Sequence, residues 1–460
     1  MHALLIPLEH AFGERYELPL PLWLFVVGGA AVVLVSFLVV LRRPTAALPQ
    51  DAPPDVVPPS RFHPFAGPLS VLVALLVAYT GIAGVQETSE NIAPLFFWLG
   101  LWIVVPMTVG ILGDWSRPVN PFANLARLGD TAAVRRRVLA RGAPLQWSFG
   151  WWPAVGLFVA LVLGELVFNL DATTPSFVGW TIVLYGLACA FLGLLYGESF
   201  VQRGEVFSGL FDAWGRLGFW RHGAPGARRF GGGLDVPFDT SPSRVVFVLL
   251  MLVSINFDGL LATPRWSSYE RRTVGTDPHD LEVLRVGSLL LLALVVLGVF
   301  LGFAYLSARA GRFGTGPLGS LALLLPSLVP IAYGYLVAHY LQYVVINGQL
   351  LLPLIGNPGY PDWPVHLPRP FNDDYVVNVA TPGSSFYWYL SVVVIVAVHV
   401  IAVLLANRRL AARAADPGRA RRAEYPWLVA MVAYTAFSLV LIAQPLTEES
   451  NSGTTVTHGR

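Results

Sequence analysis

The sequence predicts an all-α protein, a polytopic transmembrane helix bundle of about ten spans with both termini on the non-cytoplasmic side. Hydrophobic residues form 55% of the 460-residue chain and charged residues only 13%. A soluble protein of this length has roughly a quarter of its residues charged, so this chain has about half the charge that a water-covered surface needs. Apolar runs of about 20 residues, the length that crosses the hydrocarbon core, recur from end to end. Most of the surface is therefore predicted to face lipid.

Ten apolar segments follow one another along the chain. The predicted spans are residues 22–41, 67–85, 94–113, 151–170, 177–197, 245–262, 286–307, 318–346, 386–406 and 426–445. Most have the length of a helix that crosses the bilayer at about 1.5 Å per residue. Segment 318–346 is overlong and contains Pro326 and Pro330, so it is predicted to be kinked, tilted or broken. The whole chain, 1–460, is expected to form one integral membrane domain.

The orientation follows from the arginines, because positive charge gathers in cytoplasmic loops. The connections after the first, third, fifth, seventh and ninth spans hold 23 of the 30 arginines. These connections are therefore predicted to face the cytoplasm. Among them, residues 203–220 carry large apolar side chains at helical spacing opposite a thin polar face: Phe207, Leu210, Phe211, Trp214 and Leu217. This pattern predicts a cytoplasmic interfacial helix that lies in the lipid headgroups.

Two gaps in the composition exclude several kinds of chemistry. The chain has no lysine, so it has no amine for a retinal or pyridoxal Schiff base or for a Walker A loop. Its single cysteine, Cys189, excludes an intramolecular disulfide, a CxxC redox pair and a thiolate zinc site. The net charge of only +2 gives no reason to expect nucleic acid as a partner.

Ionisable residues inside predicted spans are costly to bury and are the first candidates for function. Asp258, His339 and Glu165 are the predicted catalytic residues. The predicted substrate-binding residues are Tyr335, Tyr343 and Asn347, which continue a four-residue spacing through His339, and Asn169, four residues after Glu165. His399 stands alone in the ninth span and is more simply explained as a packing histidine.

The predicted topology places Asp258, His339 and Glu165 in the outer half of the membrane, where they could form one polar cup open to the outside. Two other interpretations stay open: the carboxylates lie at the wet interface, or the histidine and tyrosines form an interhelical hydrogen-bond cluster. Histidine with carboxylates suits a divalent metal such as Zn²⁺ or Mn²⁺, but no HExxH spacing is present, so a metal cofactor is left open.

Four groups of residues resemble the sequence pattern of a known family. The N-terminal run from His10 to Leu22 reads His-x-Phe-Gly-x-Arg-Tyr-x-Leu-Pro-Leu-Pro-Leu. The others are Gly113-Asp114-Trp115 with Asn120-Pro121, Phe257-Asp258-Gly259, and Ala338-His339-Tyr340 running to Gly348-Gln349. Together they resemble a family of bacterial and archaeal multi-pass membrane proteins, some of which are labelled fenitrothion hydrolase. The resemblance implies hydrolysis of an organophosphate triester.

Three functions remain after these observations. A membrane-embedded hydrolase would take an apolar phosphate or phosphorothioate ester from the bilayer, with Asp258, Glu165 and His339 as metal ligands or as acid and base. A permease or exporter is disfavoured by the apolar inner halves of the fourth, sixth and eighth spans. A non-catalytic subunit of a membrane complex is also compatible. In each case the cell (plasma or inner) membrane is the expected location, and lipid is the expected partner; the oligomeric state is left open.

Overall fold

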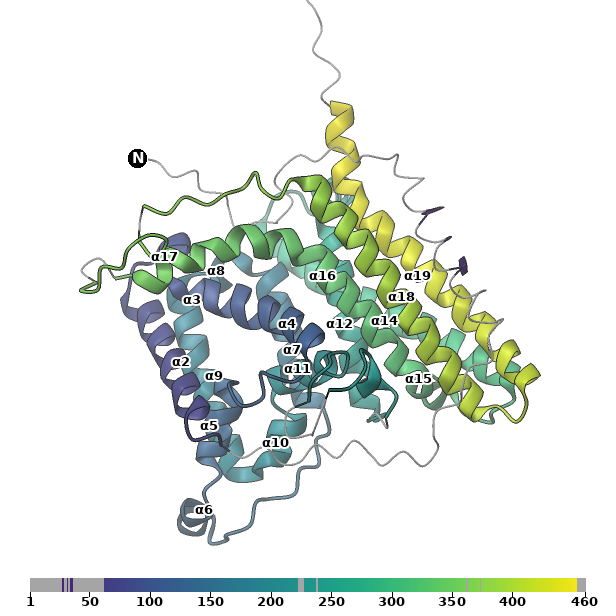
Figure 1. Cartoon of the computed structure of the whole chain (residues 1–460), viewed down its shortest axis with the longest axis horizontal. Coiled ribbons are helices and arrows are strands. Elements are labelled where there is room, and N and C mark those ends of the chain that lie inside the picture. The colour runs from purple at the N-terminus through teal and green to yellow at the C-terminus, as the bar shows by residue number, and fades with distance from the viewer. Residues whose placement is uncertain are drawn as a thin grey trace, which may run out of the picture. The chain divides into compact units, whose positions relative to one another are not determined.

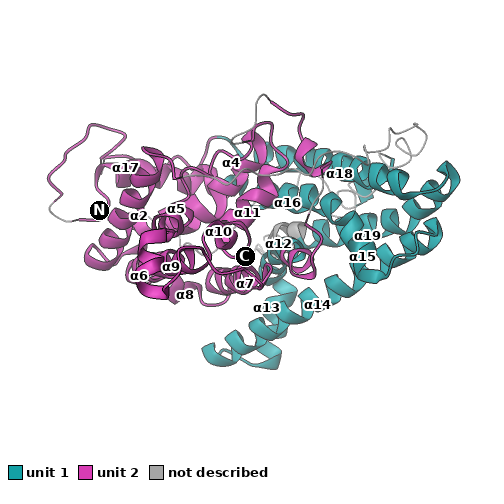
Figure 2. Ribbon diagram, turned by 90° about the horizontal axis from the view of Figure 1, so that it is seen from below, with its two compact units in different colours: residues 1–52, 248–342, 382–460 teal, residues 53–247, 343–381 magenta. Residues whose placement is uncertain are grey.

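The computed structural model describes residues 27–28, 31, 34–35, 62–221, 227–236, 239–360, 363–372 and 374–452. These residues form helices and connections and contain no strand; one isolated bridge joins Gly113 and Trp220 (Figure 1). The prediction of an all-α chain is therefore confirmed for the described residues. The chain divides into two compact units, which Figure 2 distinguishes by colour. Two of the boundaries between the units fall within helices, after Phe247 in α12 and after Gln342 in α16.

Unit 2 comprises residues 53–247 and 343–381. Its helices are α2 (Ala66–Ala83), η1 (Thr88–Glu90), α3 (Ile92–Pro94), the π-helix η2 (Leu95–Val104), α4 (Val105–Leu112), α5 (Pro121–Gly129), α6 (Ala132–Leu139), α7 (Trp152–Leu166), α8 (Asn169–Ala172), α9 (Pro175–Tyr196), α10 (Glu198–Arg203), α11 (Val206–Gly215), η3 (Gly232–Leu234), η5 (Gly348–Leu350) and α17 (Leu351–Gly356). Proline or an oxygen-bearing side chain begins several of them, as helix N-termini favour.

Unit 1 comprises residues 1–52, 248–342 and 382–460. Its described helices are α12 (Pro242–Leu261) from Val248 onward, α13 (Pro264–Thr273), α14 (Pro278–Gly311), α15 (Pro317–Leu324), η4 (Leu325–Ser327), α16 (Leu328–Asn347) as far as Gln342, α18 (Ser384–Arg413) and α19 (Pro417–Ser452). Helix α14 packs along α19, and α18 packs along α19 as well. These three helices are the longest described helices of the unit and pack against one another through α19.

Eight helical segments of the described chain are long and apolar enough to cross a membrane. They are Ala66–Ala83, Ile92–Leu112, Pro175–Tyr196, Pro242–Leu261, Pro278–Gly311, Pro317–Gly356, Ser385–Arg413 and Pro417–Leu441. Each corresponds to a predicted span, and together they fit a multi-pass membrane protein. Predicted span 151–170 contains the apolar helix Trp152–Leu166, whose 15 residues cover about 22 Å of the roughly 30 Å hydrocarbon core. Predicted span 22–41 lies largely outside the described residues.

The proline-containing segment is broken, as its sequence predicts. Helix α15 ends at Leu324, a 3₁₀ turn contains Pro326, and α16 begins at Leu328. The Ser327 hydroxyl donates to the Leu324 carbonyl oxygen at 2.6 Å, so a side chain takes up one of the carbonyls that the break releases. From Leu328 onward α16 is continuous, which places Tyr335, His339, Tyr343 and Asn347 on successive turns of one helix.

Within unit 2, α5 and α9 approach too closely for side chains at their contact. A Cβ atom on Gly193 would lie 2.0 Å from the Ala126 carbonyl oxygen, and one on Gly129 would lie 2.1 Å from that of Ala190. Glycine has no Cβ atom, so two helix backbones can approach this closely without a steric clash. Glycine is therefore required at both positions.

Helix α11 lies inside the predicted interfacial helix 203–220 and contains most of its apolar side chains. These side chains are buried within unit 2, and the Phe207 ring stacks on Phe122 with centroids 5.4 Å apart. Edge contacts join the same ring to Phe97 and Tyr185. The apolar face of α11 thus contacts protein side chains in the place where the sequence predicts lipid. The cytoplasmic location of the segment stays a prediction.

Candidate functional site

The structure brings two of the predicted catalytic residues together in unit 1. The His339 Nε2 atom lies 2.6 Å from Asp258 Oδ2, and the Tyr340 hydroxyl donates to the same oxygen at 3.1 Å. Both Asp258 and His339 are buried, with 4% and 6% of their surfaces exposed. The aspartate comes from α12 and the other two residues from α16, so residues 81 positions apart meet at one atom.

Local structure fixes both partners. Asp258 lies in the last turn of α12, where its carbonyl oxygen accepts from the Ala262 amide at 3.2 Å. His339 and Tyr340 are neighbours on α16, and their rings meet edge to face with centroids 4.6 Å apart. The aromatic contact and the shared carboxylate oxygen hold the imidazole in one orientation, as a partner group does for a catalytic base.

A buried carboxylate next to an imidazole is chemically suited to hold a proton. A carboxylate alone is expensive to bury, but a carboxylate with an adjacent imidazole can take up one proton and leave no net charge. The 2.6 Å contact has the length of a short hydrogen bond between the imidazole and the carboxylate.

A second group of polar side chains lies one helical turn from His339. Tyr335 is buried, and its ring is 6.1 Å from the His399 ring and 6.2 Å from the Tyr434 ring. His399 Nδ1 lies 2.7 Å from the Ile395 carbonyl oxygen, and its Nε2 lies 2.7 Å from the Thr435 hydroxyl. Both ring nitrogens of His399 are thus engaged, which fits its interpretation as a packing histidine.

Glu165 belongs to unit 2, where its carboxylate accepts from Trp102 Nε1 at 2.7 Å and interacts electrostatically with Tyr343. Tyr343 packs on the apolar cluster of Leu95, Leu99 and Leu354. Asn347 Nδ2 donates to the carbonyl oxygen of Tyr343 at 3.2 Å. A joint cup of Glu165 with the Asp258–His339 pair stays a prediction.

One predicted relation between site residues needs correction. Glu165 and Asn169 were expected on one face of a continuous helix, but α7 ends at Leu166 and Asn169 begins the short helix α8. The sequence after Leu166 explains the break, because Asn, Asp and Thr side chains compete with a helix for the backbone. At the break the amides of Val167 and Phe168 both donate to the Leu163 carbonyl oxygen at 2.9 Å.

The described part of the chain can be searched for groups of side chains that could bind a metal ion. Within that part no group of three or more His, Cys, Asp or Glu side chains is arranged to hold a metal ion. The Asp258–His339 pair offers two ligands. His10 lies outside the described residues. A metal cofactor is left open, as it is by the sequence.

Sequence reasoning missed two partners in the site, Tyr340 and Trp102. Tyr340 follows His339 directly, and adjacent residues on a helix point in different directions, so helical spacing gives no signal for it. Trp102 lies 63 positions from Glu165 and meets it only through the packing of the helices. A tryptophan whose ring nitrogen needs a partner in an apolar span was the available clue.

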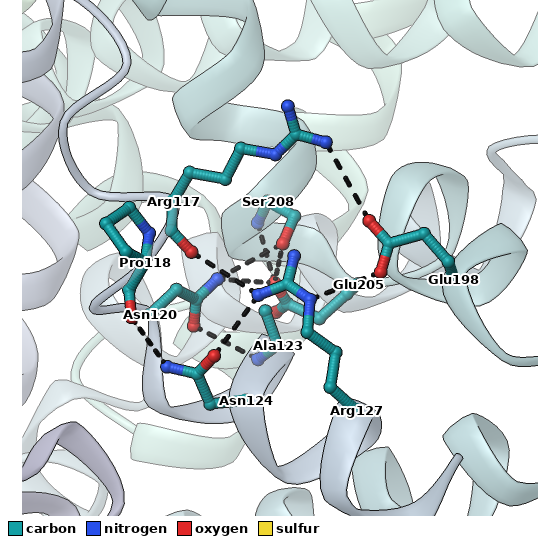
Figure 3. Close-up of polar contacts among 9 residues, drawn as sticks. All are labelled: Arg117, Pro118, Asn120, Ala123, Asn124, Arg127, Glu198, Glu205 and Ser208. Carbon is teal, nitrogen blue, oxygen red and sulfur yellow. Dashed lines mark hydrogen bonds and ion pairs between the residues drawn. The ribbon is translucent and has the colours of Figure 1, made fainter. Parts of the chain in front are cut away.

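The motif containing Asn120 and Pro121 has a structural role in unit 2. Asn120 caps α5 by accepting from the Phe122 and Ala123 amides. Its own amide donates to Glu205 at 2.8 Å (Figure 3). Glu205 is fully buried and caps α11, with further bonds from the Ser208 hydroxyl and amide and from the Tyr185 hydroxyl. Every bond to this carboxylate fixes a helix end or a neighbouring helix, so the network stabilises the fold.

Comparison with known proteins gives no relative on which to base a function. The chain matches no family model, no curated protein and no solved structure. Function is therefore inferred from the contacts among Asp258, His339 and Tyr340.

Proposed function

We propose that the protein is a ten-span enzyme of the cell membrane, with both termini on the non-cytoplasmic side, that hydrolyses an apolar ester drawn from the bilayer. The observation that carries the proposal is the buried contact of 2.6 Å between His339 Nε2 and Asp258 Oδ2, joined by the Tyr340 hydroxyl. A carboxylate that orients a histidine is the arrangement by which hydrolases activate a nucleophile.

The chemistry assigned to the pair is general base catalysis. His339 takes a proton from water as the water oxygen bonds to phosphorus, and Asp258 stabilises the imidazolium that forms. The bond from phosphorus to the leaving oxygen then breaks, and His339 returns the proton to that oxygen. Glu165 keeps its predicted catalytic role in this proposal, and Tyr335, Tyr343, Asn169 and Asn347 keep their predicted role in substrate binding. The organophosphate class of substrate follows from the resemblance to the family of multi-pass proteins described above.

A permease is the second candidate, supported by one feature of unit 1. The Asn407 amide donates to Glu424 Oε1 at 2.8 Å, and both residues are buried. Helices α18 and α19 therefore carry a second buried carboxylate, although the fourth, sixth and eighth spans are apolar in their predicted inner halves. A permease coupled to protons would use both carboxylates, whereas the proposed hydrolase requires only Asp258.

One experiment separates the two functions. Detergent-solubilised protein is assayed for release of nitrophenol from a nitrophenyl phosphorothioate, and sealed vesicles are assayed for uptake of the same compound. We expect turnover in micelles that falls by at least about 10²-fold in Asp258→Asn and in His339→Gln, the order of a lost acid–base group. The exposed residues Asp280 and His279 provide the matched controls Asp280→Asn and His279→Gln, which should keep full turnover.

The variant Glu424→Gln completes this experiment. It should leave turnover in micelles unchanged if the protein is the proposed hydrolase. Uptake in vesicles without turnover in micelles, lost in both Asp258→Asn and Glu424→Gln, would instead establish the permease. Turnover that survives Asp258→Asn and His339→Gln would remove the pair from the mechanism.

A further inference from the structure

A cavity of about 300 Å³ lies within unit 2, among η2, α7, α8, α9 and α11. It is separate from the residues of the proposed reaction. Of the fourteen residues that line it, only Thr181 and Tyr185 carry a hydroxyl, and none carries a charge. Phe97, Trp98 and Phe207 supply aromatic walls, while Ala160 and Gly164 leave space on the side of α7.

Two of the three polar side chains in the cavity wall, Tyr185 and Trp98, bond to the protein, and Thr181 is the third. The Tyr185 hydroxyl donates to Glu205 Oε1 at 2.7 Å, and Trp98 Nε1 donates to the Ala172 carbonyl oxygen at 2.9 Å. These bonds direct both polar groups into the protein. A ligand of this cavity therefore gains contact with carbon atoms and is itself apolar, because burial of its polar groups would cost free energy.

The cavity opens onto the apolar surface of a candidate membrane span. Two of its lining residues on α9, Phe177 and Leu184, are 49% and 62% exposed. Trp180 and Leu187 lie on the same helix and are also exposed. Helix α9 is one of the eight segments long and apolar enough to cross a membrane, so this surface faces hydrocarbon. The acyl chains of the bilayer would therefore lie next to the opening of the cavity.

We propose that the cavity holds the acyl chain of a membrane lipid. An apolar cavity of about 150 Å³ stays dry and accepts benzene, so one of twice that volume accommodates on the order of twelve carbon atoms. A linear chain fits the access route, because it can enter between side chains while its headgroup stays at the interface. The acyl chain passes from one apolar medium to another, so the hydrophobic effect adds little. The favourable free energy comes from van der Waals contacts with cavity walls that otherwise lack them.

Trp98 in the wall provides a direct readout. The full chain is reconstituted into phosphatidylcholine vesicles with ordinary or dibrominated acyl chains, and the emission of Trp98 is taken as the difference between wild type and Trp98→Phe. Bromine quenches tryptophan on contact, so a chain in the cavity should remove the Trp98 emission. Unchanged Trp98 emission in brominated vesicles would overturn the proposal.

Filling the cavity tests whether the quenching chain lies inside it. Ala160 is exposed and lines the cavity, so Ala160→Phe should restore Trp98 emission in brominated vesicles. Ala188 is exposed on α9 and does not line the cavity, so Ala188→Phe is the matched control and should leave the quenching unchanged. Thr181→Phe fills the same space from α9 and replaces Ala160→Phe if that variant does not elute as a monodisperse species.

Two results would count against the acyl chain. Equal quenching in wild type and in whichever filled variant folds would place the chain outside the cavity. Quenching by bromobenzene in vesicles of ordinary lipid, with none by brominated acyl chains, would assign the cavity to a compact apolar solute and overturn the proposal.

Discussion

The buried contact between Asp258 and His339 predicts an asymmetric pattern of stability in a double-mutant cycle. Removing His339 as His339→Leu leaves the Asp258 carboxylate buried with the Tyr340 hydroxyl, and breaking a buried pair in this way costs about 3–5 kcal/mol. Removing Asp258 as Asp258→Leu leaves a neutral imidazole short of one hydrogen bond, which costs about 1–3 kcal/mol. The double variant leaves neither group and should lie within about 1 kcal/mol of Asp258→Leu.

The free energies of unfolding come from reversible denaturation in mixed micelles, with helix content as the signal. His399 is the matched control, because it is a second buried histidine of unit 1 whose contacts are to Thr435 and a backbone carbonyl. The cost of His399→Leu should add to that of Asp258→Leu within about 0.5 kcal/mol. Additive costs for Asp258→Leu and His339→Leu would refute the coupling on which the proposed function depends.

Two further predictions concern topology and pH. In a Cys189→Ser background, a cysteine at Thr381 should react with an impermeant thiol reagent in intact cells, and one at Ala415 only after lysis; the reverse pattern would invert the proposed orientation. Burial raises the pKa of Asp114 to about 7, against the opposing charge of Arg117. The protonated Asp114 side chain therefore contributes fully to stability below pH about 4, and this contribution is lost as pH rises through 7. Asp114→Asn should flatten this decline in thermal unfolding, and an unchanged profile would contradict the burial effect.

Hydropathy was sufficient to predict where most of the long apolar helices lie, and the orientation that the arginine counts predict stays a prediction. Eight of the ten predicted spans coincide with apolar helices of membrane-crossing length, because about 20 apolar residues in a row have few other stable structures. The prolines also located the break before α16 correctly. The end of α7 was missed, because Val167 and Phe168 are still apolar and hydropathy does not register the turn that they form.

The site was predictable only in part, for a related physical reason. Asp258 and His339 can be identified from the sequence as candidates, because an ionisable residue inside a span is costly to bury and needs a compensating partner. Which partner each finds depends on helix packing, and no periodic pattern reports that a carboxylate on α12 reaches an imidazole on α16. The same limit applies to Glu165, whose bond to Trp102 joins helices that are distant in sequence.

The comparison of His339 with His399 gives the reason to assign chemistry to the first. Both are buried in unit 1, and both have a ring nitrogen within 2.7 Å of a polar atom. His399 contacts a backbone carbonyl and a threonine hydroxyl, neither of which carries a charge to balance an imidazolium. His339 contacts a carboxylate, so it alone of the two gains a proton without leaving a net buried charge. A proton that can be taken up and released at low electrostatic cost is what general base catalysis and proton-coupled transport both require, and in unit 1 that property distinguishes His339 from His399.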